Sequence, residues 1–98
     1  QPTSVTILSK PLSLESEKTY NLTCEVAGSH PRARVFWLEG KSKYTNGRVK
    51  ESGNSTVVYS TLKFTPGPDD HGKQLRCRGE NPVLPNLHME DTMLLNVV

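Results

Sequence analysis

Cys24 and Cys77 carry the most definite chemistry in this 98-residue sequence, because it has no other cysteine. They are 53 positions apart, a separation that matches none of the short spacings of zinc or redox sites. The sequence therefore predicts a disulfide, and closing a loop of this length stabilises a domain by about 4 kcal/mol. Two buried free thiols are the alternative.

Two asparagines stand in the Asn-x-Ser/Thr pattern that directs N-glycosylation: Asn21 before Leu22-Thr23, and Asn54 before Ser55-Thr56. Such triplets also arise by chance. Together with the cysteine pair they favour an oxidising, secreted environment. We expect glycans on both asparagines and an extracellular location, in the ectodomain of a plasma-membrane protein.

The histidines and acidic residues do not form a catalytic or metal-binding pattern. No pair of histidines has the short spacing of such sites, and all three stand in expected turns or a loop: His30, His71 and His88. The adjacent Asp69 and Asp70 supply far fewer oxygens than a calcium ion requires. We expect Asp70 to bond backbone amides in a turn, or to pair with Arg48 or Lys50. With no nucleophile, phosphate-loop or redox motif either, the sequence predicts no enzyme, metal or cofactor.

Short segments that alternate apolar and polar residues must position these groups, and no helical periodicity is seen. The expected strands span residues 4–8, 20–26, 34–38, 57–64, 74–78 and 92–98. Turns or loops separate them at residues 27–31, 39–41, 65–72 and 81–88, whereas residues 45–56 hold at most short strands. This rhythm predicts an all-β sandwich or barrel. The side chains expected in its core are Leu22, Val35, Trp37, Leu62, Phe64, Leu75 and Leu95, with the two cysteines.

Length and composition predict a single domain over residues 1–98. A hydrophobic content of 34% in so short a chain predicts a thin core that needs a covalent cross-link. A net charge of +2 is too weak to indicate a nucleic-acid-binding protein. The apolar runs are too short to span a membrane, and no signal peptide is expected.

The order Cys24, Trp37, Cys77 resembles that of immunoglobulin domains. The resemblance implies a two-sheet sandwich with an inter-sheet disulfide and the tryptophan packed on it. The cysteine spacing leaves too little room for the extra strands of a variable-type domain, so a seven-strand C2-like or constant-like arrangement is expected, with at most a short C′ strand. Leu75 stands where many of these domains have a tyrosine, two residues before the second cysteine.

Longer stretches resemble the immunoglobulin domains of the insect sidestep family. They are residues 22–31 (LTCEVAGSHP), 60–66 (STLKFTP), 70–73 (DHGK), 77–82 (CRGENP) and 89–91 (MED). This resemblance implies a transmembrane neuronal recognition protein that engages beaten-path receptors. The stretch from Asp70 to Cys77 also looks like C2-type domains of adhesion receptors of the nephrin and nectin kind.

Strand alternation predicts which side chains point away from the core. If Val35, Trp37, Leu75 and Cys77 point inward, their neighbours point outward from adjacent strands of one sheet. The outward residues of this candidate partner-binding face are Arg34, Phe36, Leu38, Arg76, Arg78 and Leu94. An apolar centre with an arginine rim is typical of a protein-binding surface. The alternative is that residues 40–46 or a neighbouring domain cover the apolar side chains.

Five cations are expected near strand 34–38 and the short C′ strand: Arg32, Lys41, Lys43, Arg48 and Lys50. Such a basic region would suit an acidic protein partner or a sulfated glycan. An ordinary solvated surface is the plainest alternative, because exposed charges commonly have no specific role.

These observations predict an extracellular domain, excised from a larger receptor, that mediates cell–cell recognition by protein contact. The sidestep resemblance implies a neuronal role in axon guidance. The expected partner is another cell-surface immunoglobulin-type protein, beaten-path-like by the same resemblance. Two alternatives remain: a structural spacer without a ligand of its own, and a module that binds sulfated glycans through the basic region.

Overall fold

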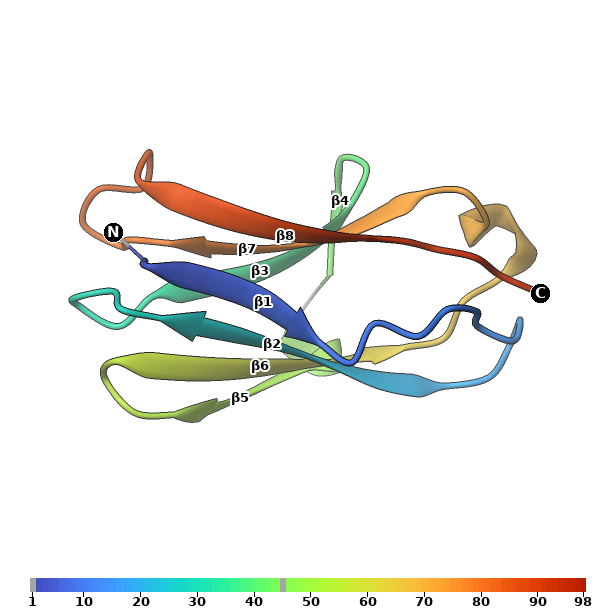
Figure 1. Ribbon diagram of the computed structural model, residues 1–98, viewed down its shortest axis with the longest axis horizontal. Coiled ribbons are helices and arrows are strands. Elements are labelled where there is room, and N and C mark those ends of the chain that lie inside the picture. The colour runs from blue at the N-terminus through green and yellow to red at the C-terminus, as the bar shows by residue number, and fades with distance from the viewer. Residues whose placement is uncertain (1, 45) are drawn as a thin grey trace.

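A computed structural model describes residues 2–44 and 46–98, which form two four-stranded antiparallel sheets packed face to face (Figure 1). The first sheet has the order β1 (Ser4–Leu8), β2 (Tyr20–Ala27), β6 (Val57–Phe64), β5 (Val49–Gly53). The second has the order β4 (Ser42–Lys43), β3 (Arg34–Glu39), β7 (Gln74–Glu80), β8 (His88–Leu94). Two 3-10 helices, η1 (Asn46–Arg48) and η2 (Pro68–Asp70), lie in connections. The predicted immunoglobulin-like sandwich is confirmed, with the short β4 as the C′ strand.

The core lies between the sheets, where alternate residues of each strand point inward. The Cys24–Cys77 disulfide links β2 to β7. Trp37 is 1% exposed and donates its indole N–H to Ser60 Oγ at 3.0 Å, from one sheet to the other. The structure buries all seven predicted core side chains: Leu22, Val35, Trp37, Leu62, Phe64, Leu75 and Leu95.

The corner before β7 is held without a tyrosine. Leu75 is fully buried in the place where the tyrosine would stand. Asp70 Oδ2 accepts a hydrogen bond from the Gly67 N–H at 2.7 Å, which is one of the two roles expected for this carboxylate. The Gly72 N–H donates to the Leu95 carbonyl oxygen at 2.8 Å. Backbone hydrogen bonds therefore fix this corner against the last residues of the chain.

The last predicted strand, 92–98, was placed four residues too late. β8 begins at His88 and ends at Leu94, because β7 extends to Glu80 and offers His88 a partner in the ladder. His88 is therefore a strand residue and not part of a loop. Residues 96–98 leave the sheet and run parallel to residues 14–16, with the Leu14 N–H donating to the Asn96 carbonyl and the Val98 N–H to the Leu14 carbonyl, both at 2.8 Å.

The segment after β4 corrects the expected basic region. β5 pairs with β6, so the chain crosses from one sheet to the other between β4 and β5. Lys50 consequently lies on the opposite sheet from Lys43, and Arg48 lies at the end of η1, directly before that sheet's edge strand β5. Sequence alternation could not show this crossing, because it identifies strands without assigning them to a sheet.

Within residues 2–44 and 46–98, no helix is long and apolar enough to cross a membrane.

Candidate protein-binding face

The outer face of the β4–β3–β7–β8 sheet, here called the Phe36 face, is built from aligned cross-strand rows. Phe36 on β3 pairs with Arg78 on β7, and Arg78 pairs with Glu90 on β8. In the next outward row, Leu38 pairs with Arg76 on one side and with Lys43 of β4 on the other. Side chains opposite one another on adjacent strands lie close enough to interact, so these rows form one continuous surface.

Glu90 fixes both arginines of this face. Its carboxylate accepts a hydrogen bond from Arg78 Nε at 2.7 Å and one from Arg76 Nη1 at 3.2 Å. Arg76 also donates through Nη2 to the Gly40 carbonyl oxygen at 2.8 Å. Burial raises the pKa of Glu90, but the hydrogen bond from Arg78 and the charges of both arginines outweigh it, so the pKa lies below its usual value. Two of the three arginines predicted for the rim, Arg76 and Arg78, thus belong to a charge-paired network.

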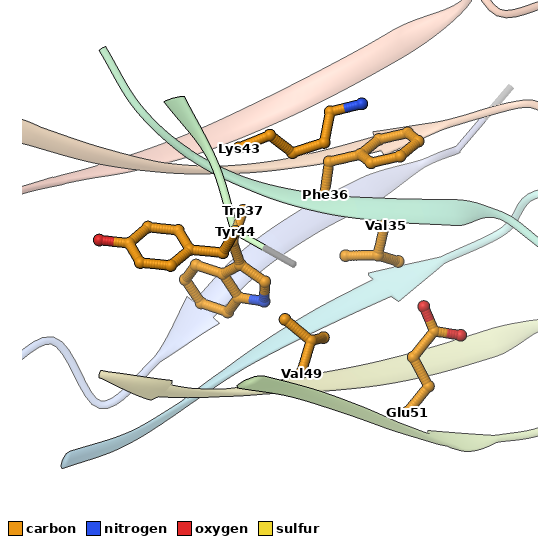
Figure 2. A pocket seen from close by; sticks show the side chains of 7 residues that line it. All are labelled: Val35, Phe36, Trp37, Lys43, Tyr44, Val49 and Glu51. Carbon is orange, nitrogen blue, oxygen red and sulfur yellow. The ribbon is translucent and has the colours of Figure 1, made fainter. Parts of the chain in front are cut away.

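Phe36 lies half-buried under a lysine. The Lys43 ammonium lies 4.3 Å from the centre of the Phe36 ring, within the range of a cation–π contact. Figure 2 shows these two side chains on the outer side of β3, with Val35 and Trp37 on the inner side. The contact keeps the ring accessible only in part and holds the Lys43 side chain over it.

A hollow of about 430 Å³ opens beside this pair, between β3 and β4 above and β5 below (Figure 2). Its lining side chains are Val35, Phe36, Trp37, Lys43, Tyr44, Val49 and Glu51. Two of them belong to the core, since Trp37 is 1% and Val35 8% exposed. The hollow therefore ends on the packed interior.

Leu94 and Arg34 lie at opposite ends of the Phe36 face. Leu94 pairs with Gln74, two outward rows from Phe36, and lines a separate hollow of about 510 Å³ with Leu12. Arg34 pairs with Glu80 at the other end and is exposed. The structure therefore brings together Phe36, Leu38, Arg76 and Arg78 but leaves the other two predicted residues at the edges.

Two members of the face were missed by sequence reasoning. Glu90 falls between the predicted loop 81–88 and the predicted strand 92–98 and was assigned to neither, and Lys43 was assigned to a separate basic region. Met89 and Met93 mark the inner side of this strand, but the charged Asp91 stands between them on the same side and interrupts the alternation, so the signal for Glu90 was weak. Lys43 could not be placed, because the position of a two-residue strand depends on the turn before it.

The five predicted basic residues are distributed over three places. Arg32 donates to Glu51 Oε1 at 3.4 Å and to carbonyl oxygens of β5 and the turn after it. Lys43 covers Phe36, and Lys41 is exposed in the turn between β3 and β4. Arg48 and Lys50 line a groove on the other sheet. They do not form the single basic region that the sequence predicted.

Both candidate glycosylation sites are exposed. Asn21 points outward from β2, on the sheet opposite the Phe36 face. Asn54 is in the turn between β5 and β6, where its Oδ1 accepts hydrogen bonds from the Thr56 N–H, the Thr56 hydroxyl and the Val57 N–H. The amide nitrogen, which would carry the sugar, is on the other branch of that side chain. Glycans at both positions remain a prediction.

Glu39, at the end of β3, lies close to Tyr44 and Asp70. Glu39 Oε1 accepts a hydrogen bond from the Tyr44 hydroxyl at 2.7 Å, while Glu39 Oε2 is buried without a hydrogen-bond partner in the described part of the chain. Burial, with Asp70 beside it, raises the pKa of Glu39 above its usual value. Burial and the hydrogen bond to the Glu39 carboxylate also raise the pKa of Tyr44. Among the described residues, no group of three His, Cys, Asp or Glu side chains is arranged to hold a metal ion.

Residues 5–86 match the family model of the CD80-like C2-set immunoglobulin domain. The chain therefore belongs to this family, and the predicted C2-type assignment is confirmed.

Its sequence relatives are larger proteins. Human Kin of IRRE-like protein 3 is 31% identical over 90 residues, which make up 86% of this chain and 11% of that protein. Human nephrin is 32% identical over 66 residues, 67% of this chain and 5% of that protein. The relatives found are therefore of the nephrin kind and not insect sidestep proteins, so the sidestep assignment is wrong. The resemblance to nephrin-type receptors is supported.

Solved structures share the fold. Rst D1-D2 superposes with a TM-score of 0.78 at 15% identity, covering 99% of this chain and 49% of that one. The full ectodomain of mouse nectin-like molecule 4 has a TM-score of 0.70 at 22% identity, covering 98% of this chain and 33% of that one.

Proposed function

We propose that this chain is an extracellular immunoglobulin domain of a cell-surface receptor, and that it recognises another immunoglobulin-type protein through the Phe36 face. One observation carries the proposal: Phe36 is held under Lys43, next to two arginines that Glu90 fixes in place. Side chains that are already ordered lose less conformational entropy when a partner binds them. A half-buried aromatic ring among arginines also matches the composition of binding hot spots.

Other features support an adhesion role outside the cell. The disulfide and the two glycosylation sequences suit an oxidising compartment. Membership of the C2-set family and the similarity to nephrin agree with a contact function without enzymatic chemistry. The role in axon guidance and the beaten-path partner were implied by the sidestep resemblance alone, so they are not part of the proposal.

A multivalent binding screen tests this function. The domain would be displayed in many copies against a panel of extracellular immunoglobulin proteins, because avidity reveals weak contacts. We expect a partner to bind the isolated domain, and Phe36→Glu to weaken that binding at least about tenfold, as for a buried hot-spot residue. Tyr59→Lys is the matched control, since Tyr59 faces outward from the opposite sheet.

Two results would overturn the proposal. Equal loss of binding in both variants would place the contact elsewhere or reveal a folding defect, which thermal unfolding of each variant separates. Binding only when a neighbouring domain is attached, with no effect of Phe36→Glu, would make the domain a spacer.

A further inference from the structure

Three cations meet in one groove on the outer face of the β1–β2–β6–β5 sheet. Arg48, Lys50 and Lys63 line it. The groove encloses about 420 Å³, and Asn21, Gly47 and Thr61 complete its lining. We call it the basic groove. It faces away from the Phe36 face, because the two sheets pack through their inner sides.

Strand register explains why these cations come together. Lys63 on β6 pairs with Asn21 on β2, and Lys50 on β5 pairs with Thr61 on β6. Val49 lies between Arg48 and Lys50 in sequence and pairs with the buried Leu62. Lys50 therefore points to the outer side, and Arg48 reaches the same groove from the end of η1. The sequence predicted Arg48 and Lys50 to lie with other cations near residues 34–38, a region that did not include Lys63.

No ion pair within residues 2–44 and 46–98 neutralises the charges of the basic groove. The ion pairs formed within the described residues use Lys10, Arg32, Arg76 and Arg78 as their cations. None of the three groove cations has a carboxylate oxygen within ion-pairing distance in those same residues. Lys50 and Lys63 lie diagonally on neighbouring strands, where their like charges repel. A polyanion bound along the groove would relieve that repulsion.

We propose that the basic groove binds a sulfated polysaccharide. Sulfate groups are permanent anions that match the three cations. The Thr61 hydroxyl already hydrogen-bonds the Thr23 hydroxyl at 3.0 Å, and its oxygen has a further lone pair that can accept from a sugar hydroxyl. The groove spans three adjacent strands, which suits an extended chain of sugars. Its lining has no aromatic or large aliphatic side chain, so the apolar centre typical of a protein interface is absent from it.

Asn21, one of the two candidate glycosylation sites, lies in the basic groove. Its side chain is exposed and lines the same groove. A glycan attached there would begin inside the groove and compete for the space. The polysaccharide site is therefore open in chains whose Asn21 carries no glycan.

The test uses the unglycosylated domain and an immobilised heparin-derived oligosaccharide. We expect binding that weakens steeply with salt, as for other polyelectrolytes. Lys63→Ala and Lys50→Ala should each weaken binding about tenfold, the effect of losing a charge-assisted contact. Lys41→Ala is the matched control, because Lys41 is exposed in the turn between β3 and β4, and it should change affinity less than about twofold, as for a screened surface charge.

Several outcomes would overturn the proposal. The first is that heparin does not bind, and the second is that the control variant loses as much affinity as the groove variants. The third is that desulfated heparin binds equally well. The fourth is stronger binding to vesicles that contain phosphatidylserine, which would make a membrane surface the ligand. Phe36→Glu should leave heparin binding unchanged, and Lys63→Ala should leave binding of the protein partner unchanged. Failure of the groove is therefore distinguishable from failure of the Phe36 face.

Discussion

The Trp37 indole N–H and the Ser60 hydroxyl oxygen lie 3.0 Å apart and connect the two sheets in the centre of the core. Both residues are essentially inaccessible to solvent, with exposures of 1% and 0%. Each sheet therefore contributes one partner to a single buried hydrogen bond, close to the disulfide that joins the same layers.

Replacing Ser60 by Ala should destabilise the domain by about 1–3 kcal/mol, because the indole N–H would remain buried without an acceptor. Denaturant unfolding followed by the fluorescence of Trp37 measures this. Ser52→Ala on the exposed edge strand β5 is the control and should change stability by less than about 0.5 kcal/mol. Equal effects of the two changes would show that the buried bond contributes nothing.

Glu90→Gln should lower the free energy of unfolding at neutral pH by up to about 1 kcal/mol, since two partly exposed ion pairs are lost. The folded-state pKa of Glu90 is depressed, so its contribution is present above the usual carboxyl pKa and disappears as pH falls through the lowered value. The free energies of unfolding of wild type and variant should therefore differ at neutral pH and become equal at acidic pH. The exposed Glu15→Gln serves as control; a constant difference at all pH values would contradict the prediction.

Glu39→Gln should have the opposite effect from Glu90→Gln and raise the free energy of unfolding at neutral pH. The folded-state pKa of Glu39 is raised, so the native carboxyl favours its proton and wild-type stability falls as pH rises through that raised value. An amide cannot lose a proton, and the variant should therefore be the more stable protein at neutral pH. The difference should vanish in acid. A variant that is less stable at neutral pH would show that the Tyr44 hydrogen bond requires the charged carboxylate.

Expression in a glycosylating host should add one glycan at Asn21 and one at Asn54, because both side chains are exposed. Intact mass, compared with the Asn21→Gln and Asn54→Gln variants, measures each addition. Thr56→Ser keeps the acceptor pattern and a hydroxyl that can bond Asn54 Oδ1, so it should retain the second glycan. A wild-type protein of unmodified mass would exclude both sites.

Strand alternation predicted much of the core. Leu22, Leu62 and Leu75 follow it, and the structure buries all three. The core also contains Ile7 and Leu14, which were not among the predicted side chains. The Cys–Trp–Cys order supplied the pairing of the sheets, which alternation alone does not contain. The sequence therefore predicted the sandwich and the inward side of most of its strands.

The sites were harder to predict, because they depend on which strands become neighbours. The crossing before β5 separates Arg48 and Lys50 from Lys43 and brings them to Lys63, which is distant in sequence. The length of β7 determines where β8 begins and thus whether Glu90 meets the arginines. Both are properties of pairing between distant segments, which a local pattern of residues does not encode.

The parallel contact between residues 14–16 and 96–98 has a mechanical consequence. The ends of the chain lie at opposite ends of the long axis (Figure 1), so a pulling force loads the hydrogen bonds of this contact in shear and all at once. If this contact breaks, the Cys24–Cys77 disulfide limits extension to the parts of the chain before Cys24 and after Cys77. Those segments include β8 and its Glu90, which would leave Arg76 and Arg78 unpaired. A force applied to the two ends of the chain would thus act on the Phe36 face before it reaches the core.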